Sequence, residues 1–348
     1  MKTSYLIFTF LISITNVAGQ GCIAIRNLTG FGQFVTPEYD EEPVKWMVNV
    51  NSRYFTSYEE FVGSTNLHVP SEDRKVNHIF VMDVAFTRVL DNGWSITVDV
   101  PVTGASRAAW QEHENNPQDK TKHTTHSFGL SDVRVALFKW LLDVSTYTRG
   151  NVQLGLGLKL PTGDYNFQDY FYKAEGKVVL PVNQSIQLGD GGTGISFELN
   201  SFYTINKKFS LYGNAFYLFN PRDQNGTYSG TKNSANSGGA VNSVPDAYTF
   251  RIGGNMTINK LVLWAGGRME GLPVHDVLGG SNGNRRPGQI ISIEPGVNFT
   301  FKEVTVYGFF PFPVYRATKQ SVPDKYDGLP SPGGFSNYMI FIGTFFKI

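Results

Sequence analysis

Twelve segments of the chain alternate apolar and polar residues with a period of two, and the connections between them alternate in length. Successive side chains of such a segment point to opposite faces, so each segment is expected to be a β-strand with one apolar face. The segments are 44–55, 78–90, 94–102, 128–142, 151–160, 193–205, 208–219, 246–258, 261–270, 289–301, 304–315 and 335–347. Most hold the roughly 9 to 11 residues, or slightly more, that a tilted strand needs to cross a hydrocarbon layer.

Connections after the even-numbered segments are short and those after the odd-numbered segments are long. The short ones are 91–93, 143–150, 206–207, 259–260 and 302–303, and the long ones are 56–77, 103–127, 161–192, 221–245, 271–288 and 316–334. This rule places the tight turns at one end of the sheet and the long loops at the other, as in an outer-membrane barrel. A soluble β-sandwich does not require this alternation of short and long connections. The fold class predicted is all-β, a transmembrane antiparallel β-barrel of about 12 strands with short periplasmic turns and long extracellular loops.

The stretch 78–102 illustrates how the two faces are used. It is a predicted hairpin that turns at Asp91-Asn92-Gly93, residue types that tolerate positive φ. Its apolar face carries Phe80, Met82, Val84, Phe86, Trp94, Ile96, Val98 and Val100. In a barrel that face meets lipid, which places Asp83 and Asp99 in the interior. The last segment, 335–347, must pair with the first to close the sheet, because an unpaired strand edge in lipid is costly.

Aromatic residues gather near the ends of these segments. Examples are Tyr54, Phe55, Tyr203, Tyr217, Phe219, Tyr307 and Tyr315. Tyrosine and tryptophan favour the boundary between lipid and water. The clustering therefore predicts an aromatic girdle on the outside of the barrel.

The N-terminus has the pattern of an export signal. Lys2, an apolar run and the small residues Val17-Ala18-Gly19 predict a signal peptide over 1–19, followed by a periplasmic leader segment over 20–43 and the barrel over 44–348. Removing 1–19 takes away one lysine and no acid, so 29 basic and 29 acidic residues remain, a balance that argues against nucleic acid. The single Cys22 excludes an internal disulfide, and it lacks the preceding aliphatic residue of a lipidation site. The expected location is the bacterial outer membrane.

Several pieces of the chain resemble an outer-membrane barrel family named for the MetA pathway of phenol degradation. The main one is Leu154–Tyr165, LGLGLKLPTGDY, with a leucine ladder, small glycines opposite and a Pro-Thr-Gly-Asp exit. The supporting pieces are Gly129–Arg134, Ser292–Gly296 and Pro311–Arg316. The resemblance implies an outer-membrane barrel of a candidate transporter family, with an aromatic-degradation context in some members. It carries over no established site residue.

Charged residues on the inward faces are the candidate lumen-lining set. They are Asp83, Asp99, Asp132, Arg134, Lys159, Glu198, Arg251 and Glu294, and Arg53 joins them in the same face pattern. Balanced charges of this kind either line a water-filled pore or pair with one another and fill a narrow barrel. For Asp132, Arg134 and Lys159 a cross-strand salt bridge that fixes the register is the favoured interpretation.

Two other chemistries are weighed and set aside. The loop 103–127 holds His113, His123 and His126, but their spacing matches no compact metal site. His78 and His275-Asp276 lie near predicted strand ends, with Ser71 and Ser281 in nearby loops. Nothing in the sequence orders these residues into a nucleophile, base and orienter. No catalytic residue, metal or cofactor is expected, and the protein is expected not to be an enzyme.

The function predicted is an outer-membrane channel or transporter for a small, hydrophobic or aromatic solute. The alternatives are a closed barrel with a structural or surface-interaction role and an enzyme acting at the outer rim. The expected partners are outer-membrane lipid, a small solute and the barrel assembly machinery, which the alternating apolar C-terminal segment suits, with no nucleic acid.

Overall fold

The described residues form one closed, twelve-strand antiparallel β-barrel, as the sequence predicts. The computed structural model describes residues 44–114, 116, 118–143, 146–228 and 240–348, so the expected signal peptide, the leader segment and Cys22 lie outside the described part. The barrel strands are β1 (Trp46–Ser57), β4 (Val76–Val89), β5 (Trp94–Ala109), β6 (His123–Leu130) with β7 (Arg134–Trp140), β8 (Gly150–Lys159), β11 (Gly194–Thr204), β12 (Phe209–Phe219), β15 (Ala247–Ile258), β16 (Leu261–Leu272), β17 (Gly288–Phe301), β18 (Val304–Phe309) with β19 (Phe312–Thr318), and β21 (Tyr338–Lys347).

The first and last strands close the barrel. β1 pairs with β21 from Met47–Lys347 to Thr56–Tyr338, which confirms the predicted partnership of the two chain ends. Each remaining strand pairs with its neighbour in sequence, and β6 and β7 share β5 while β18 and β19 share β17. A closed ring satisfies the backbone N–H and C=O groups that lipid cannot.

The two faces of the wall follow the predicted alternation. On β4, Phe80 and Phe86 are exposed on the outside, whereas Val81, Asp83 and Ala85 are buried inside. On β5, Trp94 and Ile96 are exposed in the same way. Within the described chain, no helix is both long and apolar enough to cross a membrane.

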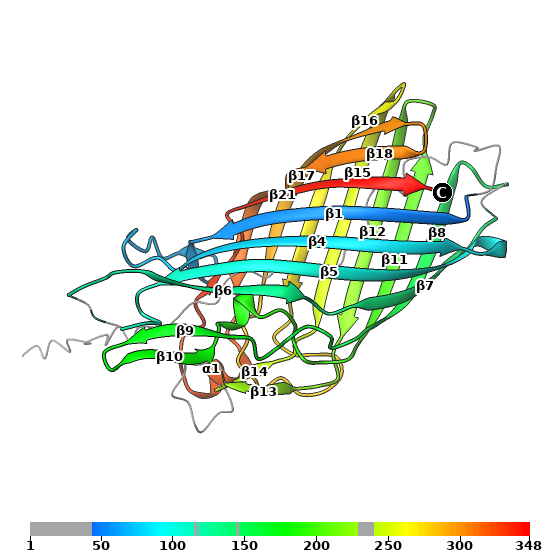
Figure 1. The fold of residues 1–348 in the computed structure, drawn as a ribbon. Helices are drawn as coiled ribbons and strands as arrows, with labels where there is room; N and C mark the ends of the chain where they lie inside the picture. Colours follow the sequence, from blue (N-terminus) through cyan, green and yellow to red (C-terminus); the bar gives the residue numbers. More distant parts are fainter. Residues whose placement is uncertain (1–43, 115, 117, 144–145, 229–239) are drawn as a thin grey trace, which may run out of the picture.

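Tight turns join the strands at one end of the barrel. The turn at Asp91–Gly93 has Asn92 and Gly93 at φ values of 57° and 75°, as their residue types predict. Asn259 and Lys302 take the same left-handed conformation in the two-residue turns 259–260 and 302–303. The C-terminus lies at this end, and the elements of the long connections lie at the opposite end (Figure 1).

The structure corrects several predicted boundaries. The loop expected over 103–127 is partly strand, because β5 continues to Ala109 and β6 begins at His123. The strand expected over 128–142 is broken at 131–133, and the strand over 304–315 is broken at 310–311. Proline has no backbone N–H. Residues two apart in a strand direct their N–H groups to the same edge, so Pro311 and Pro313 leave one edge of the strand expected over 304–315 without donors for a ladder.

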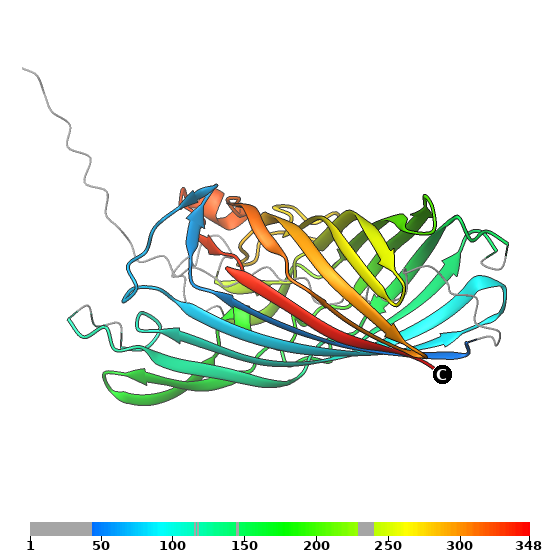
Figure 2. The same cartoon turned by 90° about the horizontal axis from the view of Figure 1, so that it is seen from above.

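The long connections are also more structured than expected. They contain β2 (Glu60–Val62), β3 (Thr65–Asn66), β9 (Gln168–Lys173), β10 (Gly176–Pro181), a 3-10 turn at Gln184–Ile186, β13 (Gln224–Tyr228), β14 (Val241–Ser243), α1 (Val322–Tyr326) and β20 (Gly333–Gly334). β2 pairs with both β3 and β20 above the barrel wall. Seen from above, the wall is an elongated tube with these elements at one end (Figure 2).

Candidate functional site: the barrel interior and its wall

All eight candidate residues point into the barrel or its mouth and are buried. They are Asp83, Asp99, Asp132, Arg134, Lys159, Glu198, Arg251 and Glu294, each at most 6% exposed. Arg53 is buried beside them and lies 5.9 Å from the ring centres of both Phe55 and Phe341. Burying charges is costly unless they pair. The partners of these side chains therefore distinguish a water-filled pore from a barrel filled by paired charges.

The pair Arg134–Glu198 crosses a strand. Arg134 stands on β7 and Glu198 on β11, with β8 between them, and Arg134 Nη1 donates to Glu198 Oε1. β8 allows this crossing because two of its inward positions, 155 and 157, are glycines. A methyl group at Gly157 would lie 3.3 Å from Arg134 Nη1, and one at Gly155 would lie 2.5 Å from the Phe138 ring. The glycines of the LGLGLKL piece therefore make room for an ion pair.

A second network lies on another part of the inner face, on β15, β16 and β17. Arg251 Nε donates to Glu294 Oε1 at 2.9 Å, again across an intervening strand, β16. Arg268 reaches Glu294 Oε2 at 3.4 Å and Glu270 Oε2 at 2.6 Å. Arg268 and Glu270 are absent from the candidate set. The inward alternation of segment 261–270 was the signal that could have found both.

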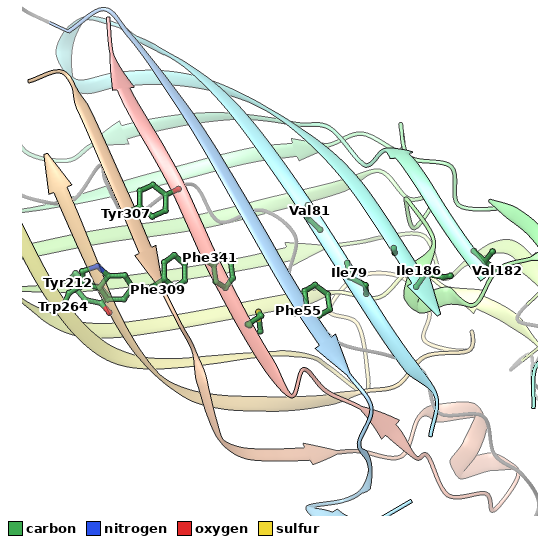
Figure 3. Packing of buried hydrophobic residues seen from close by; sticks show 12 residues of the cluster. Phe55, Ile79, Val81, Val182, Ile186, Tyr212, Trp264, Tyr307, Phe309 and Phe341 are labelled. Carbon is green, nitrogen blue, oxygen red and sulfur yellow. The ribbon is translucent and has the colours of Figure 1, made fainter. Parts of the chain in front are cut away.

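Aromatic rings fill the space between these charges. Phe309 and Phe341 stack with centres 4.2 Å apart, Arg251 lies 5.3 Å from the Phe309 centre and Arg268 lies 5.5 Å from the Phe341 centre. Figure 3 shows Tyr212 and Trp264 beside this stack and Phe55 nearby, all on the inner face. Buried rings and paired charges together pack the middle of the barrel.

The predicted aromatic girdle is therefore wrong for two of its residues. Phe55 and Tyr307 are buried inside the barrel, and the Tyr307 hydroxyl donates to Asn49 Oδ1 at 3.0 Å. Both residues lie at positions that alternate with outward side chains. The period of two, rather than nearness to a strand end, therefore decides on which side of the wall their side chains lie. Tyr54, Tyr203 and Tyr315 lie outward, in the expected place.

The extracellular mouth is filled by part of the connection between β10 and β11. We call residues Val182–Asp190 the mouth segment. Its side chains Val182, Ile186 and Leu188 are buried, and Val182 and Ile186 belong to the same cluster as Ile79 and Val81 on β4 (Figure 3). Polar contacts surround this packing, among them Asn183 Nδ2 to Glu112 Oε1 at 3.2 Å.

The first interruption of the wall lies where β6 departs from β7. The β7–β8 ladder ends at Arg134–Lys159, and among the described residues no ladder joins β6 to β8. The mouth segment occupies this place: the Ser127 hydroxyl donates to Ile186 O, and a methyl group at Gly129 would lie 3.0 Å from Leu188 Cδ1. We call this the β6 interruption.

Residues from two of the resemblance pieces anchor the β6 interruption. Asp132 accepts from the backbone N–H of Gly163 at 3.0 Å and of Asp190 at 3.2 Å, and Lys159 Nζ lies 3.7 Å from Asp132 Oδ2 while also contacting the Asp190 carboxylate. The Thr162 hydroxyl accepts from Val133 N at 2.9 Å and donates to the Ser131 carbonyl at 2.8 Å. Gly129–Arg134 and Leu154–Tyr165 therefore fold against each other at one place.

The second interruption lies where β18 gives way to β19. The β18–β21 ladder ends at Phe309–Phe341, and among the described residues no ladder joins β19 to β21. Arg316 spans the space, with Nη1 3.0 Å from Glu59 Oε2 and Nη2 3.2 Å from the Asn337 carbonyl. Above it, Thr318 N donates to Gly63 O at 2.9 Å. We call this the β19 interruption; Phe312, Val314 and Tyr315 line it with exposed side chains.

The histidines of the 103–127 connection do not gather around one point. His113 is buried with its Nδ1 accepting from Tyr172 N at 3.1 Å, and His123 stacks on the Tyr172 ring at 4.1 Å. His126 is turned outward, 3.8 Å from Asp169. Burial, followed by the nearby His123, lowers the pKa of His113 to about 4. The part of the chain that the structure describes holds no group of three or more His, Cys, Asp or Glu side chains placed to bind a metal.

The candidate rim residues make other contacts. The Ser281 hydroxyl accepts from Asp276 N at 2.9 Å, and the Asp276 carboxylate receives Arg285 through two bonds of 2.7 Å and 2.6 Å. His78 Nδ1 lies 2.8 Å from the Tyr54 hydroxyl. Ser71 is exposed next to Glu72. These contacts do not form a chain from nucleophile to base to orienter.

Comparison with known proteins supports the fold. No protein-family model and no curated protein matches the chain. Among solved structures, an outer membrane channel from Pseudomonas putida F1 aligns over 90% of this chain and 98% of its own, with a TM-score of 0.58 and 10% identity. The toluene transporter TbuX of Ralstonia pickettii aligns over 88% of this chain and 90% of its own, with a TM-score of 0.42 and 9% identity. The first likeness shows an outer-membrane barrel fold, and the second is too distant to add to it.

Proposed function

We propose that this protein is an outer-membrane channel for a small, hydrophobic or aromatic solute, which enters at the extracellular mouth and leaves sideways through the wall. The observation that carries the proposal is a contrast within the barrel. The middle of the interior is packed with buried rings and ion pairs, whereas the backbone ladder of the outer half is interrupted twice. A solute that prefers lipid to water has no need of a continuous aqueous path.

The packed interior disfavours a water-filled pore. A polar solute passing straight through would have to separate pairs such as Arg134–Glu198 or Arg251–Glu294. Removing one partner from a buried pair costs about 3–5 kcal/mol. An apolar solute moving from the mouth into lipid instead gains about 25 cal/mol for each Å² of apolar surface removed from water.

Uptake measurements test this proposal. Cells that display the protein in their outer membrane are expected to take up a labelled aromatic hydrocarbon faster than cells without it, and to show no gain for a neutral monosaccharide. In planar bilayers the purified protein is expected to give no steady conductance steps. Large conductance steps together with monosaccharide uptake would contradict the sideways route.

The closed structural barrel is retained as a second candidate because the same buried ion pairs would also stabilise a barrel that transports nothing. A folded protein that takes up neither solute would favour it. Folding is checked in the same preparations by the change in gel mobility between unheated and boiled samples.

The remaining parts of the proposal concern location and partners. We propose that the chain acts in the bacterial outer membrane after removal of residues 1–19, that the assembly machinery reads the apolar alternation of β21, and that the protein is not an enzyme. The contacts of Ser281 and Asp276 described above support the last point. The motif pieces that meet at the β6 interruption support membership of the family named for phenol degradation.

A further inference from the structure

The hairpin of β9 and β10 exposes apolar and aromatic side chains outside the barrel mouth. Tyr170 is 58% exposed and Val179 is 52% exposed, and the two face each other across the hairpin pairing. Lys177 lies on the same face, with Nζ 4.8 Å from the centre of the Tyr172 ring. Val178 and Leu180 on the other face are also exposed. Such residues are unusual on an extracellular loop that faces water on all sides.

The hairpin continues the outer surface of the wall. β9 lies beside β6, where Asp169 Oδ2 accepts from His126 N at 2.7 Å, and Figures 1 and 2 both place the hairpin at the side of the barrel. β6 carries the most exposed phenylalanine of its neighbourhood, Phe128, at 74%. Phe128 covers Gly104 of β5 and stands above Leu130 in the same outward row.

The register gives the height of the hairpin relative to lipid. On β5, the outward row runs from Trp94 at the turn end to Gly104, which pairs with Phe128. Ten residue steps of a strand tilted by about 45° rise roughly 24 Å, close to the height of about 25 Å expected for the apolar belt of an outer-membrane barrel. Phe128 therefore marks the upper edge of the belt. Asp169 lies level with His126, so the hairpin begins one outward position above that edge.

We propose that the outer face of the β9–β10 hairpin docks on the outer leaflet, with Tyr170 and Val179 at the level of the lipid headgroups and Lys177 facing their phosphates. The occupant is lipid because the face is continuous with the lipid-facing row of β6. Tyrosine and lysine are the residue types that favour this boundary.

Lipid docking of this hairpin also bears on the mouth. β10 ends at Pro181, and the next residue, Val182, is the first buried residue of the mouth segment. One end of the mouth segment is therefore tied to the membrane surface and the other end to Asp132 through Asp190. The inference rests on the barrel fold and is independent of the proposed solute.

Fluorescence quenching by lipid tests the proposal. Full-length protein carrying Cys22→Ser and Val179→Cys, labelled with bimane, is reconstituted in phosphatidylcholine–phosphatidylglycerol vesicles that contain lipids with a nitroxide at the headgroup or deep in the acyl chain. The matched controls are Leu156→Cys, 61% exposed in the middle of β8, and Tyr326→Cys, 79% exposed on α1. Gel mobility confirms that each labelled protein is folded.

The bimane at residue 179 is expected to be quenched by the headgroup nitroxide at least half as strongly as the bimane at residue 156 is quenched by the acyl-chain nitroxide. Quenching no greater than at residue 326 by either lipid would overturn the proposal. Bimane fluorescence at residue 179 that neither nitroxide lipid quenches, but that changes when unlabelled protein is added, would assign this face to a second copy of the chain. That result would also overturn the proposal.

Discussion

The β6 and β19 interruptions remove the backbone ladder from two parts of the same wall, but the structure closes them by different means. At the β6 interruption, the buried mouth segment fills the space and Asp132, Lys159 and Thr162 hold the surrounding backbone. At the β19 interruption, the partly exposed side chain of Arg316 spans the space toward Glu59 and Asn337. Removing one partner of a buried ion pair costs far more than removing one partner of an exposed pair.

This difference indicates which part of the wall opens at least cost. Freeing the β6 interruption requires the mouth segment to leave the apolar contacts of Ile186 and Leu188 and to break buried bonds to Asp132. Freeing the β19 interruption requires the partly exposed ion pair of Arg316 with Glu59, the bond from Arg316 to the Asn337 carbonyl and the bond from Thr318 N to Gly63 O to separate. We therefore expect the β6 interruption to govern stability and the β19 interruption to govern passage.

The largest expected effect is at the β6 anchor. Asp132→Ala removes the acceptor of two backbone N–H groups and leaves buried Lys159 with Asp190 as its acidic neighbour. A loss of about 3–5 kcal/mol in the free energy of unfolding is expected, because two N–H groups lose their acceptor, at about 1–3 kcal/mol each, and Lys159 loses one of its two acidic neighbours. Urea unfolding followed by gel mobility measures it. Asp119→Ala is the control, since Asp119 makes local bonds to Thr121 at the surface, and an equal loss in both variants would refute the anchoring role.

An intermediate effect is expected at the glycine that lets Arg134 cross β8. Gly157→Val places a side chain against Ser196 and Arg134 Nη1, and overpacking of this kind typically costs about 1–3 kcal/mol. The same urea titration measures the change. Gly267→Val is the matched control, because nothing lies within 4 Å of that position on β16. If Gly157→Val is as stable as the control, the crossing does not depend on a small residue.

Much of this fold can be predicted from local sequence patterns, whereas only one of the two interruptions of the wall has a local cause. Strands and turns were predictable because period-two faces and residues such as Asn92-Gly93 act over a few positions. The break at Pro311 had a visible cause in the missing donor. The break at Ser131–Val133 had no cause visible in the local sequence. Asp132 leaves the strand there because its carboxylate accepts from Gly163 N and Asp190 N, which are distant in sequence.

The candidate site was predictable to a similar extent. Alternation placed Asp83 and Arg251 on the inner face, and it would have placed Arg268 and Tyr307 there had it been applied to every strand. The mouth segment was not predictable, because Val182–Asp190 has no period and its burial depends on β4 and β5. The pairing of charges across an intervening strand also depends on the curvature of the barrel. A pattern in the linear sequence carries no information about that curvature.

A smaller effect on stability, but the clearest effect on passage, is expected at the β19 interruption. Arg316→Met removes a partly exposed ion pair worth about 1 kcal/mol or less, so the unfolding free energy should hardly change. If this side chain limits opening, uptake of an aromatic hydrocarbon should rise by up to about fivefold, the factor that corresponds to about 1 kcal/mol. Lys319→Met, an exposed neighbour, is the control. Unchanged uptake in Arg316→Met would remove the β19 interruption from the solute route.

The most local of the expected effects is a response to pH beside the β6 interruption. Burial holds the pKa of His113 at about 4, below its ordinary value of 6.5, so the unfolded segment binds more protons between these values. The stabilising contribution of neutral His113 is therefore complete above pH 6.5 and is lost as the pH falls toward 4. Because His113 Nδ1 accepts from Tyr172 N, protection of that amide should fall by up to about tenfold for each pH unit within this window. Hydrogen exchange, corrected for its intrinsic pH dependence, measures this, with the Gly63 amide beside the β19 interruption as the control because it donates to the Thr318 hydroxyl. Equal changes at the two amides would show that acid loosens the whole mouth rather than the β6 side.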